Sequence, residues 1–320
     1  MCKYFSCIID RNGQVYWLKN SNSHEDIIRI NNLKDDKIED RDFVRIEIIP
    51  KDGKRVTRNK KDWVLKVDEP GTLPKWYIKN KKQNEKLCWN EWKKSVKKQI
   101  AINTEKRIVK DTYVIAQGNS HVEAHDNSHI DAYDNSHIKA HDNSHIKAYD
   151  NSHIDAYDNS HIDAYDNSHV VAHDNSHIKA YDNSYIDAYD NSEVEAYDNS
   201  HVVAHDNSHI KAHDNSYIYF CSVSCIDAYD NSKVEVYGDS QVKAYDNSHV
   251  VAHDNSEVEA YDYSQVTANH NAKILLCDRT ICFRLSGNVK LNSKTCVCID
   301  MFSDKILLKE GAEVEFQKKD

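Results

Sequence analysis

The chain has no long apolar run. No stretch approaches the roughly 20 apolar residues that a membrane-spanning helix needs, and residues 1–7 lack the apolar run of a secretory signal peptide. Its nine cysteines are an odd number without regular spacing, which argues against a disulfide framework. We therefore expect a protein of the cytoplasm that carries reduced thiols and does not associate with a membrane.

Motifs that indicate catalysis are also missing. The sequence contains no glycine-rich phosphate loop and no His-Glu-x-x-His, and its Ser-His pairs do not form a triad. With only seven glycines, it lacks the Gly-Gly-x-Gly-x-Asp repeat of calcium-binding β-rolls. The pairs Cys221/Cys225 and Cys296/Cys298 favour small interior positions over a metal site. We expect a non-enzymatic protein without a cofactor.

Charge divides the chain into three segments. Residues 1–112 contain 27 basic and 17 acidic residues, residues 113–272 contain 6 and 28, and residues 273–320 contain 9 and 7. All five tryptophans lie in the first segment, whereas eighteen of the nineteen histidines lie in the second. A basic unit and a strongly acidic, histidine-rich unit therefore share the chain.

An eight-residue repeat dominates the second segment. Serine recurs at every eighth position from Ser120 to Ser264, which makes nineteen octads of the type Ser-His-Ile-Asp-Ala-Tyr-Asp-Asn. A period of eight does not match the 3.6-residue period of a helix, and a β-branched residue in every octad favours strands. Periodicity this strict is typical of solenoids, in which each repeat adds one unit to a stack.

Each octad predicts one short strand and one turn. Alternation along a strand places Ser128, Ile130 and Ala132 on the inward face, and His129, Asp131 and Tyr133 on the outward face. Asp134 and Asn135 then form the corner, where asparagine tolerates a left-handed conformation and both side chains can hydrogen-bond within the turn.

Two octads per coil give a flattened, 16-residue coil with two parallel sheets, and three octads give a 24-residue triangular coil. Serine, alanine and one isoleucine or valine per strand can fill the space between two sheets. The same residues leave a triangular interior empty, which close packing disfavours. We predict the two-sheet parallel β-solenoid, with the triangular coil as the alternative.

The paired octads resemble the 16-residue repeat of bacterial ice-nucleation proteins, which also place alanine and serine at fixed positions. The likeness implies a similar coil and covers about half of the chain. Ice-binding faces in that family carry Thr-x-Thr rows, whereas the outward positions here are histidine, tyrosine, lysine and acidic residues. The resemblance therefore concerns architecture and implies no ice binding.

The remaining segments flank this solenoid. We assign residues 1–100 to a small basic α+β domain, 101–119 to a linker and N-terminal cap, 120–271 to the octapeptide solenoid, and 272–320 to degenerate coils and a C-terminal cap. In the last segment the inward positions are predicted to be Ala272, Ile274, Leu276, Gly287, Val289, Leu291, Thr295, Val297 and Ile299, followed by Ile306, Leu308, Ala312, Val314 and Phe316.

Residues 1–100 predict a mixed fold. Strands are expected over residues 4–9, 14–18, 43–49 and 63–67, the first two joined by a turn at residues 10–13. Ser23 is expected to cap one helix, and a second helix is expected over about residues 84–100. Its lysines, Lys93, Lys94, Lys97 and Lys98, either complement the helix dipole or form a basic patch.

Two motifs of this domain, Ser23-His24-Glu25-Asp26 and Leu73-Pro74-Lys75-Trp76-Tyr77, are similar to the leaders of uncharacterised repeat proteins from phages and gut bacteria. That resemblance implies no activity.

Stacked coils place equivalent residues in columns about 4.8 Å apart. Two histidine columns, which include His121, His137, His153 and His129, His145, His161, offer metal ions two ligands at a time, so they favour weak adventitious binding. The candidate binding surface consists of corner aspartates and neighbouring tyrosines: Asp126, Asp134, Asp142, Asp150, Asp158, Asp166, Asp174, Tyr133, Tyr149, Tyr157 and Tyr165.

These features favour an interaction protein whose acidic rod binds a protein with a basic, nucleic-acid-binding surface, such as a phage-encoded nucleic-acid mimic or inhibitor. In this it resembles the pentapeptide-repeat proteins that imitate duplex DNA, without their five-residue repeat. Self-assembly through the basic head and the acidic rod is the first alternative, and a repeat protein that binds divalent metal is the second. We expect no direct nucleic-acid binding by the rod, and nucleic acid stays open as a partner of residues 1–100.

Overall fold

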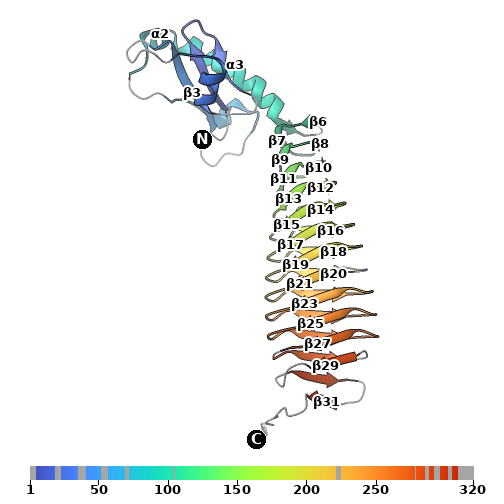
Figure 1. The fold of residues 1–320 in the computed structure, drawn as a ribbon. Helices are drawn as coiled ribbons and strands as arrows, with labels where there is room; N and C mark the ends of the chain where they lie inside the picture. Colours follow the sequence, from blue (N-terminus) through green and yellow to red (C-terminus); the bar gives the residue numbers. More distant parts are fainter. Residues whose placement is uncertain are drawn as a thin grey trace. The chain divides into compact units, whose positions relative to one another are not determined.

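The computed structural model describes residues 5–18, 23–34, 41–51, 57–68, 72–103, 105–220, 225–277, 279–284, 288–291, 296–301 and 305–308. The chain forms two compact units: Met1–Ala101 with Thr112–Ile115, and Ile102–Asp111 with Ala116–Asp320 (Figure 1). Among the helices in the described part of the chain, none is long and apolar enough to cross a membrane.

The first unit contains a four-stranded antiparallel sheet. Its order is β2 (Val15–Tyr16), β1 (Phe5–Asp10), β3 (Phe43–Pro50) and β4 (Trp63–Val67). The predicted hairpin between the first two strands is confirmed. The Asp10 carboxylate accepts hydrogen bonds from the amides of Asn12 and Gln14, and Gly13 takes a left-handed φ of 81°. These contacts fix the turn.

Helices cover both faces of this sheet. Helix α1 (His24–Ile30) is capped by Ser23, as predicted, and its Ile27 packs with Ile8 and Phe43. Helix α3 (Lys81–Gln99) starts three residues before the prediction, and Cys88 on it meets Cys7 on the opposite face. A short helix α2 (Lys75–Lys79) and a 3-10 turn η1 (Lys60–Asp62) were not predicted.

A solenoid of two parallel sheets makes up most of the second unit (Figure 1). The even sheet consists of β6 (Lys106–Lys110), β8 (His121–His125), β10 (His137–Ala140), β12 (His153–Ala156), β14 (His169–Ala172), β16 (Tyr185–Ala188), β18 (His201–Ala204), β20 (Tyr217–Phe220), β22 (Lys233–Val236), β24 (His249–Ala252), β26 (Gln265–Ala268), β28 (Ile281–Arg284), β30 (Val297–Asp300) and the final strand β31 (Lys305–Leu308).

The odd sheet consists of β5 (Ile100–Ile102), β7 (Tyr113–Gln117), β9 (His129–Ala132), β11 (His145–Ala148), β13 (His161–Ala164), β15 (His177–Ala180), β17 (Glu193–Ala196), β19 (His209–Ala212), β21 (Cys225–Ala228), β23 (Gln241–Ala244), β25 (Glu257–Ala260), β27 (Lys273–Leu276) and β29 (Asn288–Leu291). The chain alternates between the two sheets, so strands that are adjacent in sequence lie in different sheets.

The register of both sheets is 16 residues. Ile138 pairs with Ile154 in the even sheet, and Ile146 pairs with Ile162 in the odd sheet. The fold class and the 16-residue coil are thus confirmed, and the 24-residue alternative is wrong. The predicted inward set is also confirmed, because serine, isoleucine or valine, and alanine are buried in coil after coil between the two sheets. Small side chains allow the sheets to approach without leaving voids.

The corners depart from the prediction in two ways. The left-handed residue is the aspartate, with φ of 59° at Asp142, and not the asparagine. Its carboxylate also bonds between coils instead of within a turn. The Asp142 amide donates to Asp158 Oδ2 at 3.1 Å, and the Asn159 amide donates to the Asp142 carbonyl at 2.9 Å. These hydrogen bonds link the corners of successive coils, and they run along the stack as the hydrogen bonds of the two sheets do.

Replacing Asp158 by alanine should lower the free energy of unfolding by about 2 kcal/mol. Alanine adds roughly 1 kcal/mol of left-handed strain, and the Asp142 amide loses an acceptor worth about 1 kcal/mol. Asp158→Gly is the matched control, since it loses the acceptor but fits the backbone, as Gly238 does at an equivalent corner with φ of 73°. Urea denaturation should show a smaller loss for glycine. Equal losses would mean that left-handed strain is unimportant at this corner.

The C-terminal coils keep the parallel ladder through β30, and β31 then pairs with it antiparallel. Cys282, Cys296 and Cys298 are fully buried, so the prediction that Val297 and Ile299 point inward is wrong by one residue. The small cysteine side chains take the interior positions there. The prediction of interior positions for Cys225 and Ile306 is wrong, because both side chains are exposed. The predicted positions Gly287, Thr295, Ala312, Val314 and Phe316, and Cys221, lie outside the described residues.

Candidate binding surface

Two edges of the solenoid carry the corner aspartates. The tyrosine edge follows the odd strands and contains Tyr133, Tyr149, Tyr165, Tyr181, Tyr197, His213, Tyr229, Tyr245 and Tyr261 with Asp134, Asp150, Asp166, Asp182, Asp198, Asp214, Asp230, Asp246 and Asp262. The histidine edge follows the even strands and contains His125, His141, Tyr157, His173, Tyr189, His205, Tyr237 and His253 with Asp126, Asp142, Asp158, Asp174, Asp190, Asp206 and Asp254. The predicted surface residues therefore fall on two separate edges.

The tyrosine edge is a regular ladder. Neighbouring phenol rings stack 4.9 Å apart at Tyr133 and Tyr149 and 5.1 Å apart at Tyr149 and Tyr165, with nearly parallel planes. Beside them, each aspartate accepts the amide of the preceding corner, as Asp166 does from Asp150 at 3.1 Å. Burial and neighbouring carboxylates raise the pKa of Tyr149 and Tyr165, so the phenols stay neutral donors. The edge presents fixed carboxylates next to hydroxyl groups.

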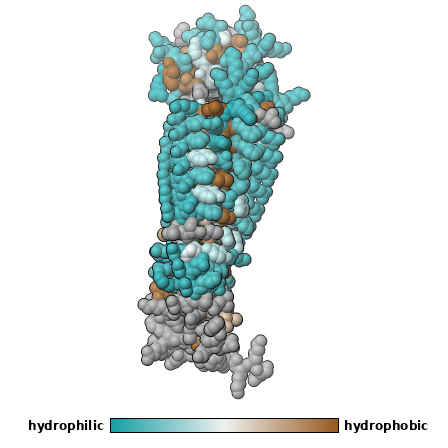
Figure 2. Space-filling model, turned by 90° about the vertical axis from the view of Figure 1, so that its right-hand side faces the viewer, coloured by the Kyte–Doolittle hydropathy of each residue, from teal (hydrophilic) through white to brown (hydrophobic). Residues whose placement is uncertain are grey.

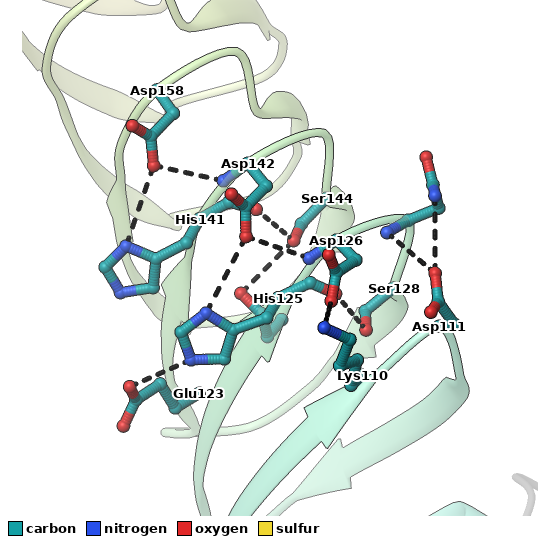
Figure 3. Close-up of polar contacts among 12 residues, drawn as sticks. Lys110, Asp111, Glu123, His125, Asp126, Ser128, His141, Asp142, Ser144 and Asp158 are labelled. Atoms are coloured by element: carbon teal, nitrogen blue, oxygen red, sulfur yellow. Dashed lines mark hydrogen bonds and ion pairs between the residues drawn. The ribbon is translucent and has the colours of Figure 1, made fainter.

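The histidine edge brings imidazoles to the carboxylates (Figure 3). His125 Nδ1 lies 3.7 Å from Asp142 Oδ2, and His141 Nδ1 lies 3.9 Å from Asp158 Oδ2. His125 Nε2 also lies 3.0 Å from Glu123 Oε1. The imidazoles of this edge therefore lie beside the corner carboxylates of the next coil.

The outward face of the odd sheet is nearly neutral. Its central row alternates in sign: Asp131, Lys147, Asp163, Lys179, Glu195, Lys211, Asp227, Lys243 and Glu259. Lys179 and Lys211 contact Glu195 at 3.2 and 3.9 Å. Sixteen of the 28 acidic residues in the acidic segment instead occupy the left-handed corner positions. Net negative charge is thus concentrated along the edges.

The even face differs from the odd face. Val171, Val203 and Val251 are half-buried in its central row, where the odd sheet carries charges. Figure 2 shows hydrophobic residues at intervals down the middle of one face of the solenoid. The charged residues of this row are four acids and one lysine, Glu123, Asp155, Asp187, Glu235 and Lys139, so this face carries fewer acidic residues than either edge.

The predicted histidine columns lie on the two faces. His121, His137 and His153 stack on the even face, and His129, His145 and His161 stack on the odd face, with ring centroids 4.8 to 5.5 Å apart. Parallel rings aim their nitrogens in parallel directions, not at a common point. In the described residues, neither column brings three ligand atoms within 4.8 Å of one another.

The predicted basic residues Lys93, Lys94, Lys97 and Lys98 are exposed on α3.

Acid should destabilise the stacked columns. Burial and neighbouring imidazoles lower the pKa of His137, His145 and His153. The unfolded chain therefore takes up protons first, so stability is intact above about pH 6.5 and declines as the pH falls toward the lowered values. We expect a lower thermal midpoint at pH 5.5 than at pH 7.5, with a smaller difference when all three are glutamine. A midpoint that rises in acid would show that histidine–aspartate pairing dominates.

Fold and surface together define a repeat protein: a two-sheet parallel β-solenoid of 16-residue coils, preceded in the sequence by a small α+β unit. Comparisons with protein-family models, with curated proteins and with solved structures found no match to the chain.

Proposed function

We propose that this chain is a non-enzymatic binding protein of the cytoplasm whose tyrosine edge engages a basic, nucleic-acid-binding protein. The observation that carries the proposal is the column of corner carboxylates, each held by a backbone amide of the preceding coil, as in Asp182 with Asp166 at 3.2 Å. A carboxylate fixed in this way loses little side-chain freedom when a lysine or arginine binds it.

The charge density of the rod supports this proposal. Residues 113–272 are long enough for ten coils of 16 residues, and they carry a net charge of −22. At about 4.8 Å per coil, the rod carries one net negative charge per about 2.2 Å. Duplex DNA carries one per about 1.7 Å of its axis. A protein surface that binds the phosphates of duplex DNA would therefore encounter a similar density of negative charge along this rod.

The chemistry of the two edges favours the tyrosine edge. Its phenols stay neutral, and they can donate hydrogen bonds to the partner while their rings stack with arginine or lysine. At the histidine edge, imidazoles such as His173 already lie 3.8 Å from the aspartate of the next coil. A lysine or arginine of the partner would have to share these carboxylates with the imidazoles.

Capture from a cell lysate tests this function. The full chain is used as bait with washes at low and high salt, and the mass of the eluted complex is measured by light scattering. We expect basic nucleic-acid-binding proteins at low salt and their loss at high salt, because released counterions make such contacts salt-dependent. Recovery of the chain alone in large, salt-sensitive particles would contradict the proposal and favour head-to-rod self-assembly.

A further inference from the structure

Three potential metal ligands meet in the first unit, away from the solenoid. His24 lies at the start of α1, Glu47 lies in β3, and Asp68 directly follows β4. One ligand atom from each lies within 4.8 Å of the others. Strand alternation places Glu47 on the same face of the sheet as Ile8 and Phe43, which pack against α1. The fold thus brings together residues that are far apart in sequence.

The hydrogen bonds of His24 define which nitrogen faces the carboxylates. Its side chain is buried, and Nε2 lies 3.2 Å from the Ile46 carbonyl oxygen. Because that oxygen can only accept, Nε2 carries the hydrogen. The opposite nitrogen, Nδ1, lies 3.3 Å from Asp68 Oδ2. In the neutral ring the lone pair of Nδ1 would then face the negatively charged Asp68 oxygen, which is repulsive. A proton or a cation must therefore lie between the two atoms.

A metal ion accounts for more of this site than a proton does. A proton on Nδ1 satisfies only the contact with Asp68, whereas a divalent ion also uses Glu47. Metal-binding histidines commonly donate their second ring hydrogen to a backbone carbonyl, as His24 does to Ile46.

A fourth group supports a polar ligand at this place. Ser6 is the cross-strand partner of Glu47, which puts both side chains on the same face of the sheet. The Ser6 hydroxyl is buried, and its oxygen has no hydrogen-bond partner in the structure. A metal-bound water between the strands would give it one. Asp68 is exposed to solvent, which leaves a path for an ion to enter. Lys66, also opposite Glu47, is a competing cation.

We propose that His24 Nδ1, Glu47 and Asp68 bind a divalent transition metal ion, with Zn²⁺ as the expected ion. One imidazole and two carboxylates suit zinc, and water completes its coordination. The ion would tie α1 to β3 and β4. This proposal is independent of the function assigned to the solenoid.

Zinc titration of the full chain tests the site. The chain is stripped with a chelator and titrated with Zn²⁺ alone against a competing zinc-binding dye. We expect one tight equivalent, followed by weaker binding to the histidines of the solenoid. Glu47→Gln and Asp68→Asn should each weaken the tight equivalent at least 10-fold and leave the weaker phase unchanged. X-ray absorption of the one-to-one complex should show imidazole nitrogen and carboxylate or water oxygen at about 2.0–2.2 Å.

Asp42→Asn is the matched control. Asp42 is an exposed carboxylate of the same unit that pairs with Arg11 at 3.1 Å, outside the three-residue group. Its replacement should leave the tight equivalent unchanged. Absence of a tight equivalent from the unaltered chain, or equal affinity in the Glu47→Gln and Asp68→Asn variants, would overturn the proposal.

Discussion

Binding of the captured basic partner should weaken by about 10- to 100-fold at low salt when five aspartates of the tyrosine edge are replaced by asparagine: Asp150, Asp166, Asp182, Asp198 and Asp214. Each carboxylate contributes an exposed ion pair worth about 0.2–1 kcal/mol, and five of them lie in one continuous column. Asparagine tolerates the left-handed corner and keeps an oxygen for the amide of the preceding coil, so the fold should persist. Titration of the purified partner at several salt concentrations measures both the affinity and its salt dependence.

A matched variant separates the position of the charges from their number. This variant replaces five acidic residues of the central row of the odd sheet by asparagine or glutamine: Asp131, Asp163, Glu195, Asp227 and Glu259. It removes the same number of charges, but from positions where lysines alternate with them. Because these carboxylates already face lysines, we expect a loss of less than about threefold. Equal losses in the two variants would show that total charge, and not the tyrosine edge, determines binding.

Aspartate in place of Ile154 should cost about 4–5 kcal/mol of unfolding free energy. Ile154 is fully buried between the sheets, with Ile138 and Val170 as its partners in the neighbouring coils. The change removes about 2–3 kcal/mol of apolar burial and places a carboxylate without a partner in a dry interior. Each coil contacts its neighbours in the stack, so the damage should be local. Hydrogen exchange should accelerate in the coils on either side of β12.

The reverse change at the next residue is the control. Asp155→Ile exchanges the same two residue types on the outward side of β12, where the side chain is half-buried. We expect a change within about 1 kcal/mol, as for most surface substitutions. If Asp155→Ile proved as damaging as Ile154→Asp, the assignment of inward and outward positions would be wrong.

The period of eight predicted most of the solenoid. Ser128, Ile130 and Ala132 alternate with polar residues, so strand geometry alone defines the buried face. Their small volumes also favoured two sheets over three. The corner could not be predicted in the same way, because the carboxylate that bonds to the Asp142 amide belongs to Asp158, one coil later. That bond exists only after the coils stack.

Stacking of alternate octads predicts that the corner aspartates lie at two separate corners, but the division of histidine and tyrosine between those corners was not predicted. Sorting the octads into alternate members assigns His125 and His141 to one edge and Tyr133 and Tyr149 to the other. The same sorting reveals the alternating charges of the odd sheet. The group of His24, Glu47 and Asp68 is different, because no spacing links these residues and only the packing of α1 on the sheet joins them. The shift at Cys296 and Cys298 had no signal beyond a weaker repeat.

Competition with duplex DNA tests the central claim most directly. The partner captured by the full chain is purified and loaded with a labelled duplex, and the chain is then added while fluorescence anisotropy reports the bound duplex. We predict that the unaltered chain displaces the duplex and that the variant with five asparagines on the tyrosine edge does not do so at the same concentration. A complex in which the partner holds chain and duplex together, or equal displacement by both forms, would contradict the account.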